Sequence, residues 1–136
     1  MKILLDTHIF LWFISGDTRL SADVRDIIQD LDNEIYLSVV SIWEAIVKYK
    51  LGKLPLPETP EIYFPKHCDR HQIFNLDLDR ASVSQLAKLP PLHRDPFDRM
   101  IICKYFGRTF TSVRIQAKHH AHIDILDNVM LLIQYI

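Results

Sequence analysis

Short apolar runs that alternate with helical segments constrain the fold of this chain most. Residues 2–5 form an apolar run that ends at Asp6, and residues 34–38 form a second run before a helical stretch. Runs of this kind are typical of buried parallel strands, and a parallel pair needs a long crossover connection, usually a helix. The pattern therefore predicts an α/β fold with a mostly parallel central sheet flanked by helices.

Capping residues and helical spacing predict the remaining elements. Ser21 should cap a helix that contains Val24, Ile27, Ile28 and Leu31, and the segment Ser41-Ile42-Trp43-Glu44 matches a capping box that opens a helix. That helix should run to Leu51 and Gly52. We further expect helices at residues 8–14, 62–68 and 79–86, a helix from Asp95 to Gly107, and strands at residues 73–76, 109–113 and 123–126. Residues 129–136 are apolar but too short to assign by periodicity.

Length and charge limit the possible functions. The chain has 136 residues, of which 49% are hydrophobic, and this suits a single domain, residues 1–136, with a sizeable core. The formal net charge of -1 excludes the global basic field that drives non-specific nucleic-acid binding. Any contact with RNA must therefore use local basic clusters.

The cysteine count and the chain start bear on the compartment. Only Cys68 and Cys103 occur, and the start has too few apolar residues before Asp6 for a signal-peptide core. No apolar run approaches the ~20 residues that a membrane span needs. These features predict a cytoplasmic protein without a membrane segment.

Three carboxylates stand where an α/β sheet collects functional residues. Asp6 follows the first predicted strand, and Glu44 and Asp98 fall in the first turns of two predicted helices. Crowded carboxylates repel one another unless a cation neutralises them, and hard oxygen ligands suit Mg²⁺ or Mn²⁺. The sequence therefore predicts a pocket in which Asp6, Glu44 and Asp98 bind a metal that promotes phosphate hydrolysis.

Each of these acids also has a plainer interpretation. Glu44 and Asp98 both stand at the third position of a predicted helix, where acids satisfy backbone N–H groups and the helix dipole. Asp6 after an apolar strand is often only a polar loop residue. The joint occurrence of all three on one inferred sheet edge favours the metal-binding interpretation.

Three segments of the chain resemble a known family. They are Leu4-Leu5-Asp6-Thr7-His8 with Leu11 and Trp12, then Ser38 to Glu44 with Lys48 and Gly52-Lys53-Leu54, and His93-Arg94-Asp95-Pro96-Phe97-Asp98-Arg99. In order and spacing they resemble the motifs of PIN-domain ribonucleases, most closely the VapC-like toxins of toxin–antitoxin pairs. The resemblance is strongest over residues 1–111.

The resemblance implies a three-layer, Rossmann-like PIN fold and a metal-dependent endoribonuclease that hydrolyses RNA with metal-activated water. It also implies a homodimer and a VapB-like antitoxin partner. Asp6, Glu44 and Asp98 would be the catalytic, metal-ligating acids, and Asp95 a supporting residue.

Other residues near the motifs have two interpretations each. The Thr7 hydroxyl could orient the neighbouring carboxylate or simply close a strand-to-helix turn. Lys48, Arg94 and Arg99 are candidates for contacts with RNA phosphates, although solvated helix faces explain them equally well.

The sequence departs from the family after its third motif. The family usually shows Thr-x-Asp there, but this chain reads Thr111-Ser112-Val113-Arg114, so the fourth acid is missing. Residues 113–136 are atypical, which indicates divergence or a shifted reading frame, and nothing in the sequence places Asp124 or Asp127 in the pocket. We therefore expect weakened metal binding, and an alternative function is a PIN-domain module that binds antitoxin or RNA without cleavage.

A function outside this family is less consistent with the residues. Haloacid-dehalogenase-like phosphatases and receiver domains also place an aspartate at the tip of the first strand. The phosphatases need a second acid two residues later, where His8 stands, and receivers need adjacent acids before that aspartate.

Overall fold

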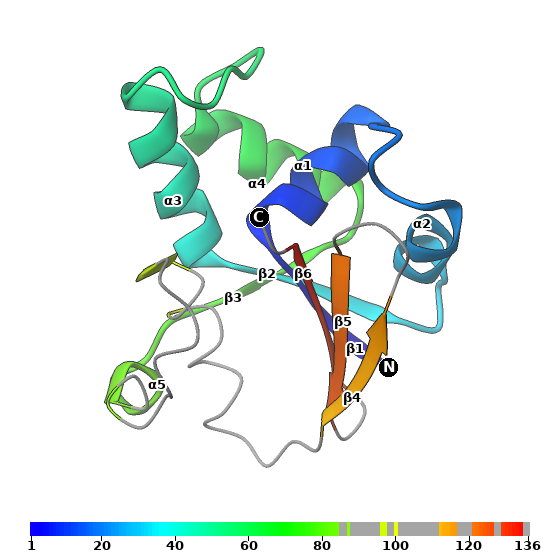
Figure 1. Cartoon of the computed structure of the whole chain (residues 1–136). Helices are drawn as coiled ribbons and strands as arrows, with labels where there is room; N and C mark the ends of the chain where they lie inside the picture. Colours follow the sequence, from blue (N-terminus) through cyan, green and yellow to red (C-terminus); the bar gives the residue numbers. More distant parts are fainter. Residues whose placement is uncertain are drawn as a thin grey trace.

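The computed structural model describes residues 1–84, 87, 96, 97 and 100, together with the backbone of three later strands (Figure 1). The elements in chain order are β1 (Lys2–Leu5), α1 (Thr7–Ser15), α2 (Ala22–Gln29), β2 (Glu34–Ser38), α3 (Val39–Lys50), α4 (Pro60–Arg70), β3 (Phe74–Leu76), α5 (Arg80–Ser84), β4 (Ser112–Gln116), β5 (Ala121–Leu126) and β6 (Val129–Gln134).

One sheet joins all six of these strands in the order β3-β2-β1-β6-β5-β4. β1 pairs in parallel with β2 on one side and β6 on the other, and β2 pairs in parallel with β3. β5 runs antiparallel to both β4 and β6. The first and last strands of the chain therefore lie side by side at the centre of the sheet (Figure 1). The expectation of a mostly parallel sheet is confirmed for the half that contains β1.

Both faces of the central strand are withdrawn from water. Ile3 and Leu5 belong to the main apolar core and are fully buried. Leu4 points to the opposite face, because successive side chains of a strand alternate, yet it is only 2% exposed. A central strand buried on both faces is what a three-layer arrangement requires.

The main core forms where helices cover one face of the sheet. α1, α3 and α4 lie together on the same side in Figure 1. The Phe10 ring of α1 stacks on the Phe64 ring of α4 with their centroids 4.8 Å apart, and both side chains are fully buried. This aromatic pair joins the first helix to the fourth. None of the described helices has the length and apolar character that crossing a bilayer needs.

Most predicted helix boundaries are confirmed. The Ser21 hydroxyl accepts a hydrogen bond from the Val24 backbone N–H at 3.3 Å and so caps α2. Gly16 ends α1 in the left-handed conformation, with φ at 67°, which glycine adopts without strain. The assignment of Leu31 to α2 is wrong, because the helix ends at Gln29 and Leu31 is 93% exposed.

The predicted capping box at Ser41 is wrong. α3 begins at Val39, and Ser38 is its N-cap, with a hydroxyl that accepts from the Val40 backbone N–H at 3.2 Å. The chain therefore passes directly from β2 into α3. Both Ser38 and Ser41 satisfy the preference for serine at an N-cap, and the glutamate three residues after Ser41 made the local pattern favour the wrong one.

The later elements agree only in part with the predictions. The strand expected at residues 109–113 begins at Ser112, and the unassigned apolar run contributes β6. Pro96, Phe97 and Met100 are helical, as expected of the third motif, but the predicted cap Asp95 and the helix end at Gly107 lie outside the described residues. β5 agrees with the strand predicted at residues 123–126.

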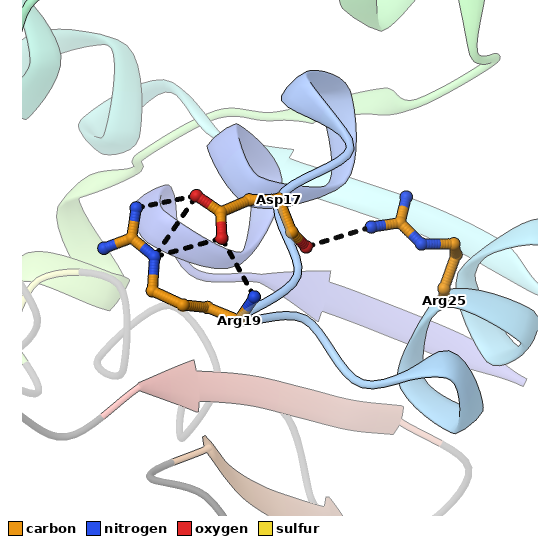
Figure 2. Close-up of polar contacts among 3 residues, drawn as sticks. All are labelled: Asp17, Arg19 and Arg25. Atoms are coloured by element: carbon orange, nitrogen blue, oxygen red, sulfur yellow. Dashed lines mark hydrogen bonds and ion pairs between the residues drawn. The ribbon is translucent and has the colours of Figure 1, made fainter.

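A polar cluster fixes the turn between α1 and α2 (Figure 2). The Arg19 guanidinium binds both carboxylate oxygens of Asp17, with Nη2–Oδ2 and Nε–Oδ1 distances of 2.7 and 3.1 Å. Arg25 donates to the backbone carbonyl oxygens of Phe13 and Asp17, each at 3.3 Å. The second helix thus provides hydrogen bonds for carbonyl groups at the C-terminal end of the first.

The Asp17 carboxylate should make stability depend on acidic pH. Its hydrogen bonds from the Arg19 side chain and backbone lower its pKa from 3.8 to about 2. A depressed carboxylate pKa contributes stability above pH 3.8 that is lost as the pH falls toward 2. We expect the melting temperature of the wild type to fall more steeply than that of Asp17→Asn between pH 4 and 2. Thermal melts across this range test it, and 1 M NaCl should reduce the difference.

Loss of the buried Phe64 ring should destabilise the protein strongly. We expect Phe64→Ala to lower the free energy of unfolding by about 3–5 kcal/mol, because it leaves a cavity against Phe10. Ile62→Ala is the matched control, since Ile62 lies on the same helix and is 56% exposed. Urea denaturation followed by circular dichroism measures both, and equal losses would contradict the assignment of Phe64 to the core.

Candidate metal centre at the carboxyl edge of the sheet

The parallel register of β1 and β2 brings their carboxyl ends to one edge. Leu5 is opposite Leu37, and the next residues are Asp6 and Ser38. Each is followed at once by a helix, α1 after Asp6 and α3 after Ser38. Both side chains are buried, with 3% of Asp6 and 1% of Ser38 exposed. The carboxyl edge of a parallel sheet is where α/β proteins place their ligand sites.

Asp6 occupies this edge without acting as a helix cap. It stands at the N-cap position of α1, but its side chain makes no capping hydrogen bond. Its Oδ2 atom lies 3.8 Å from Nδ1 of His8, a contact that becomes an ion pair when the imidazole is protonated. The simple capping interpretation therefore does not account for this carboxylate.

Glu44 lies further from the start of its helix than the sequence suggested. Since Ser38 caps α3, Glu44 lies beyond the first turn, and that turn contains no acid. Backbone N–H groups at this depth bond within the helix, so Glu44 does not satisfy free helix-end groups. Only 1% of the residue is exposed. The interpretation of Glu44 as a capping-box acid is wrong.

Among the described residues, two side chains compensate the buried Glu44 carboxylate. The Thr7 hydroxyl donates to Oε2 at 2.6 Å, and the Lys48 ammonium forms a salt bridge with Oε1. A buried carboxylate needs such partners, because removing its charge from water is otherwise costly. Thr7 thus contacts a carboxylate at this edge, and the carboxylate is that of Glu44 rather than that of the neighbouring Asp6.

The structure places two of the three predicted acids, both buried, near the carboxyl edge of β1 and β2. Asp6 is adjacent in sequence to Thr7, and Thr7 contacts Glu44 across the β1–β2 edge. The third acid Asp98, the supporting residue Asp95, and the basic residues Arg94 and Arg99 lie outside the described residues. Within the part of the chain that is described, no group of three His, Cys, Asp or Glu side chains could hold a metal ion.

The two described acids fit a hard divalent cation as part of its ligand set. Both provide carboxylate oxygens, the donors that Mg²⁺ and Mn²⁺ prefer, and neither is engaged in capping a helix. Mg²⁺ is commonly held by one or two carboxylates with water completing its octahedron. Asp6 and Glu44 would therefore be the protein ligands from this edge, and Asp98 is the expected third.

The strand order separates β4 from the carboxyl ends of β1 and β2, where Asp6 and Glu44 lie. Val113, which stands where the family motif has its fourth acid, is the second residue of β4. Since β6 and β5 lie between β1 and β4, three inter-strand spacings of about 4.8 Å put β4 roughly 14 Å from β1. Asp124 pairs with Leu131, which is opposite Leu4, so Asp124 is two strands away from β1.

Some contacts of this centre were not predicted from the sequence. The approach of His8 to Asp6 and the capping by Ser38 depend on the turn from strand into helix. The Glu44–Lys48 pair had a readable signal, because a glutamate four residues before a lysine is a favourable helical spacing. The burial of Glu44 gives that pair its importance here.

Comparisons with known proteins agree with this architecture. The family model "PIN domain" matches residues 3–104. The chain is similar to "Ribonuclease VapC16" of Mycobacterium tuberculosis, with 43% identity over 67 residues that cover 46% of this chain and 48% of that protein. The match thus spans about half the length of this relative.

A solved structure supports the fold independently. The crystal structure of VapBC2 from Rickettsia felis bound to a DNA fragment from their promoter superposes with a TM-score of 0.56 and 16% sequence identity. The superposition covers 79% of this chain and 82% of that one. The predicted three-layer α/β fold class and the resemblance to VapC-like proteins are therefore confirmed. Because the family model spans most of its length, the chain belongs to the PIN domain family.

Proposed function

We propose that this protein is a metal-dependent endoribonuclease, the toxin of a VapBC-like toxin–antitoxin pair in the cytoplasm. It hydrolyses RNA phosphodiester bonds with water activated by Mg²⁺ or Mn²⁺. The observation that carries the proposal is the burial of Asp6 and Glu44 at one sheet edge, with neither acid used as a helix cap. The similarity to a protein named as a ribonuclease supports the same reaction.

The residues at this edge would have different roles in the reaction. Asp6 and Glu44 would hold the cation, with Asp98 as the proposed third ligand. Thr7 fixes the orientation of the Glu44 carboxylate through its 2.6 Å hydrogen bond. A bound divalent cation would supply activation of water and stabilisation of the charge that develops on the phosphate. Asp95 is proposed as a supporting residue, and Arg94, Arg99 and Lys48 as contacts for RNA phosphates.

The proposed partners are an RNA substrate, a VapB-like antitoxin and a second copy of this chain. The antitoxin is supported by the structural similarity to a VapBC complex. The homodimer rests on the resemblance to the family alone. Local basic residues must hold the RNA, because the net charge of -1 provides no general attraction.

A second function is favoured by one specific observation. Val113 replaces the family's fourth acid, and its strand β4 is three strands away from β1. With fewer acids, the site should bind metal more weakly than a four-acid site. A PIN-domain module that binds antitoxin or RNA without cleavage is therefore the alternative.

Cleavage of a mixed RNA pool distinguishes the two functions. We expect the wild type to cleave with Mg²⁺ or Mn²⁺, and Asp6→Asn to fall to the level of a metal-free control, because it weakens a ligand of the cation. The Asp6→Asn preparation also controls for contaminating nucleases. A folded wild type that cleaves no more than this variant would contradict the nuclease proposal and favour the binding module.

The Thr7 hydroxyl should contribute to both metal binding and stability. We expect Thr7→Val to lower Mn²⁺ affinity or RNA cleavage by about 10–100-fold, since an orienting partner of a ligand is lost. Its free energy of unfolding should fall by about 1.5–3 kcal/mol, because the hydrogen bond is to a charged group. Calorimetry and urea denaturation measure these effects.

Thr7→Ser is the matched control, because it retains the hydroxyl that donates a hydrogen bond to Glu44. It should keep most of the affinity and stability of the wild type. Equal effects of valine and serine at this position would show that the methyl group matters and would contradict the role given to the hydroxyl.

A further inference from the structure

Lys48 forms a salt bridge with Glu44, a contact that its proposed role in RNA binding does not explain. Lys48 lies four residues after Glu44, so both side chains project from the same face of α3. Its ammonium contacts Oε1 of a carboxylate that is 2% exposed, while the lysine side chain itself is 26% exposed. One end of the pair is therefore buried in the metal centre and the other reaches water.

An ammonium on a flexible stem is a suitable temporary counterion. Without a cation, the buried Glu44 charge would depend on the Thr7 hydroxyl and on Lys48 for compensation. A lysine ammonium is a compact charge on a mobile chain, and the partial exposure of Lys48 leaves it a route to solvent. It can therefore leave Glu44 without a rearrangement of the helix.

A divalent cation and the Lys48 ammonium make competing demands on Glu44. Like charges that share one carboxylate repel one another, so binding of the cation is opposed while Lys48 remains in place. The apparent affinity for metal then falls in proportion to the population in which Glu44 is available. Thr7 does not compete, since a neutral hydroxyl can stay bound to Oε2.

We infer that the Lys48 ammonium neutralises the Glu44 carboxylate in the metal-free protein and is displaced from it when a divalent cation binds. This inference rests on the proposed function, because it concerns the same metal centre. It assigns Lys48 two states, an ion pair with Glu44 in the metal-free protein and a released ammonium in the loaded one. The released ammonium would then be available to an RNA phosphate.

Calorimetric titration of the RNA-free protein with Mn²⁺ tests the inference. We expect Lys48→Met to bind Mn²⁺ at least about fivefold more tightly than the wild type, because its cation has no internal competitor. The metal-free variant should also melt about 5 °C lower than the wild type, since Glu44 loses its counterion. Lys48→Arg should restore the wild-type values.

Lys50→Met is the matched control. It removes the same charge from the same helix, but Lys50 is exposed and lies six residues from Glu44, on another face. It should leave both the affinity and the melting temperature close to the wild type. Equal changes in Lys48→Met and Lys50→Met would overturn the inference, because net charge alone would explain them.

A measurement on the wild type tests the inference even when a variant fails to fold. The Lys48 ammonium signal, followed by nuclear magnetic resonance during titration with Mg²⁺, should move from an ion-paired to a solvated position. An unchanged signal at saturation would overturn the displacement.

The failures of the two proposals differ. Mn²⁺ binding that is identical in wild type and Lys48→Met would overturn the role of Lys48 and leave the metal centre intact. Absence of binding in both folded proteins would overturn the metal centre itself, and the inference with it. Binding by Lys48→Met but not by the wild type would support the inference in its strongest form.

Discussion

The Glu44 carboxylate is almost completely withdrawn from water, and a charge in that position needs polar partners from the chain itself. Thr7 provides one from the first turn of α1, and Lys48 provides the other from the next turn of α3. These contacts require the start of α1 and the middle of α3 to meet at the tip of β1. The parallel pairing of β1 with β2 produces that meeting, because it brings both strand ends to one edge.

The sheet has two halves with different origins in the chain. The half with β3, β2 and β1 comes from the first 76 residues and carries the candidate site. The half with β6, β5 and β4 comes from the atypical tail and is joined by antiparallel pairs. β6 pairs with β1, and β4 is the outermost strand of this half. The place of β4, three strands from β1, and the valine at position 113 both support the proposal of a metal centre with fewer acids.

In the proposed metal centre, stability and metal binding would depend on the same atoms. The partners that make a buried Glu44 tolerable are the groups that a cation must share or displace. Sites of this kind are commonly a compromise, since residues arranged for function are rarely those that give the greatest stability. Thr7 and Lys48 should differ in this respect, because a hydroxyl supports the carboxylate in both states whereas an ammonium supports it only in one.

The strands β1 and β2 and the caps at Ser21 and Gly16 were predictable, because buried parallel strands are continuous apolar runs and caps depend on local hydrogen bonds. Asp6 was predictable as an edge carboxylate for the same reason, since a strand end follows from a strand assignment, whereas Glu44 lies further along α3 than the sequence predicted. The start of α3 was not predictable, because the local capping-box pattern favours Ser41, whereas the helix begins at Val39 directly after β2.

The partner of Thr7, the counterion role of Lys48 and the place of β6 also depended on the tertiary structure. The Thr7–Glu44 contact and the pairing of β6 with β1 join residues far apart in the sequence, whereas the Glu44–Lys48 spacing was readable and only the burial of Glu44 was not. An apolar run such as residues 129–134 becomes a strand only when neighbours offer it a ladder of hydrogen bonds, and here one of those neighbours is β1, at the opposite end of the chain.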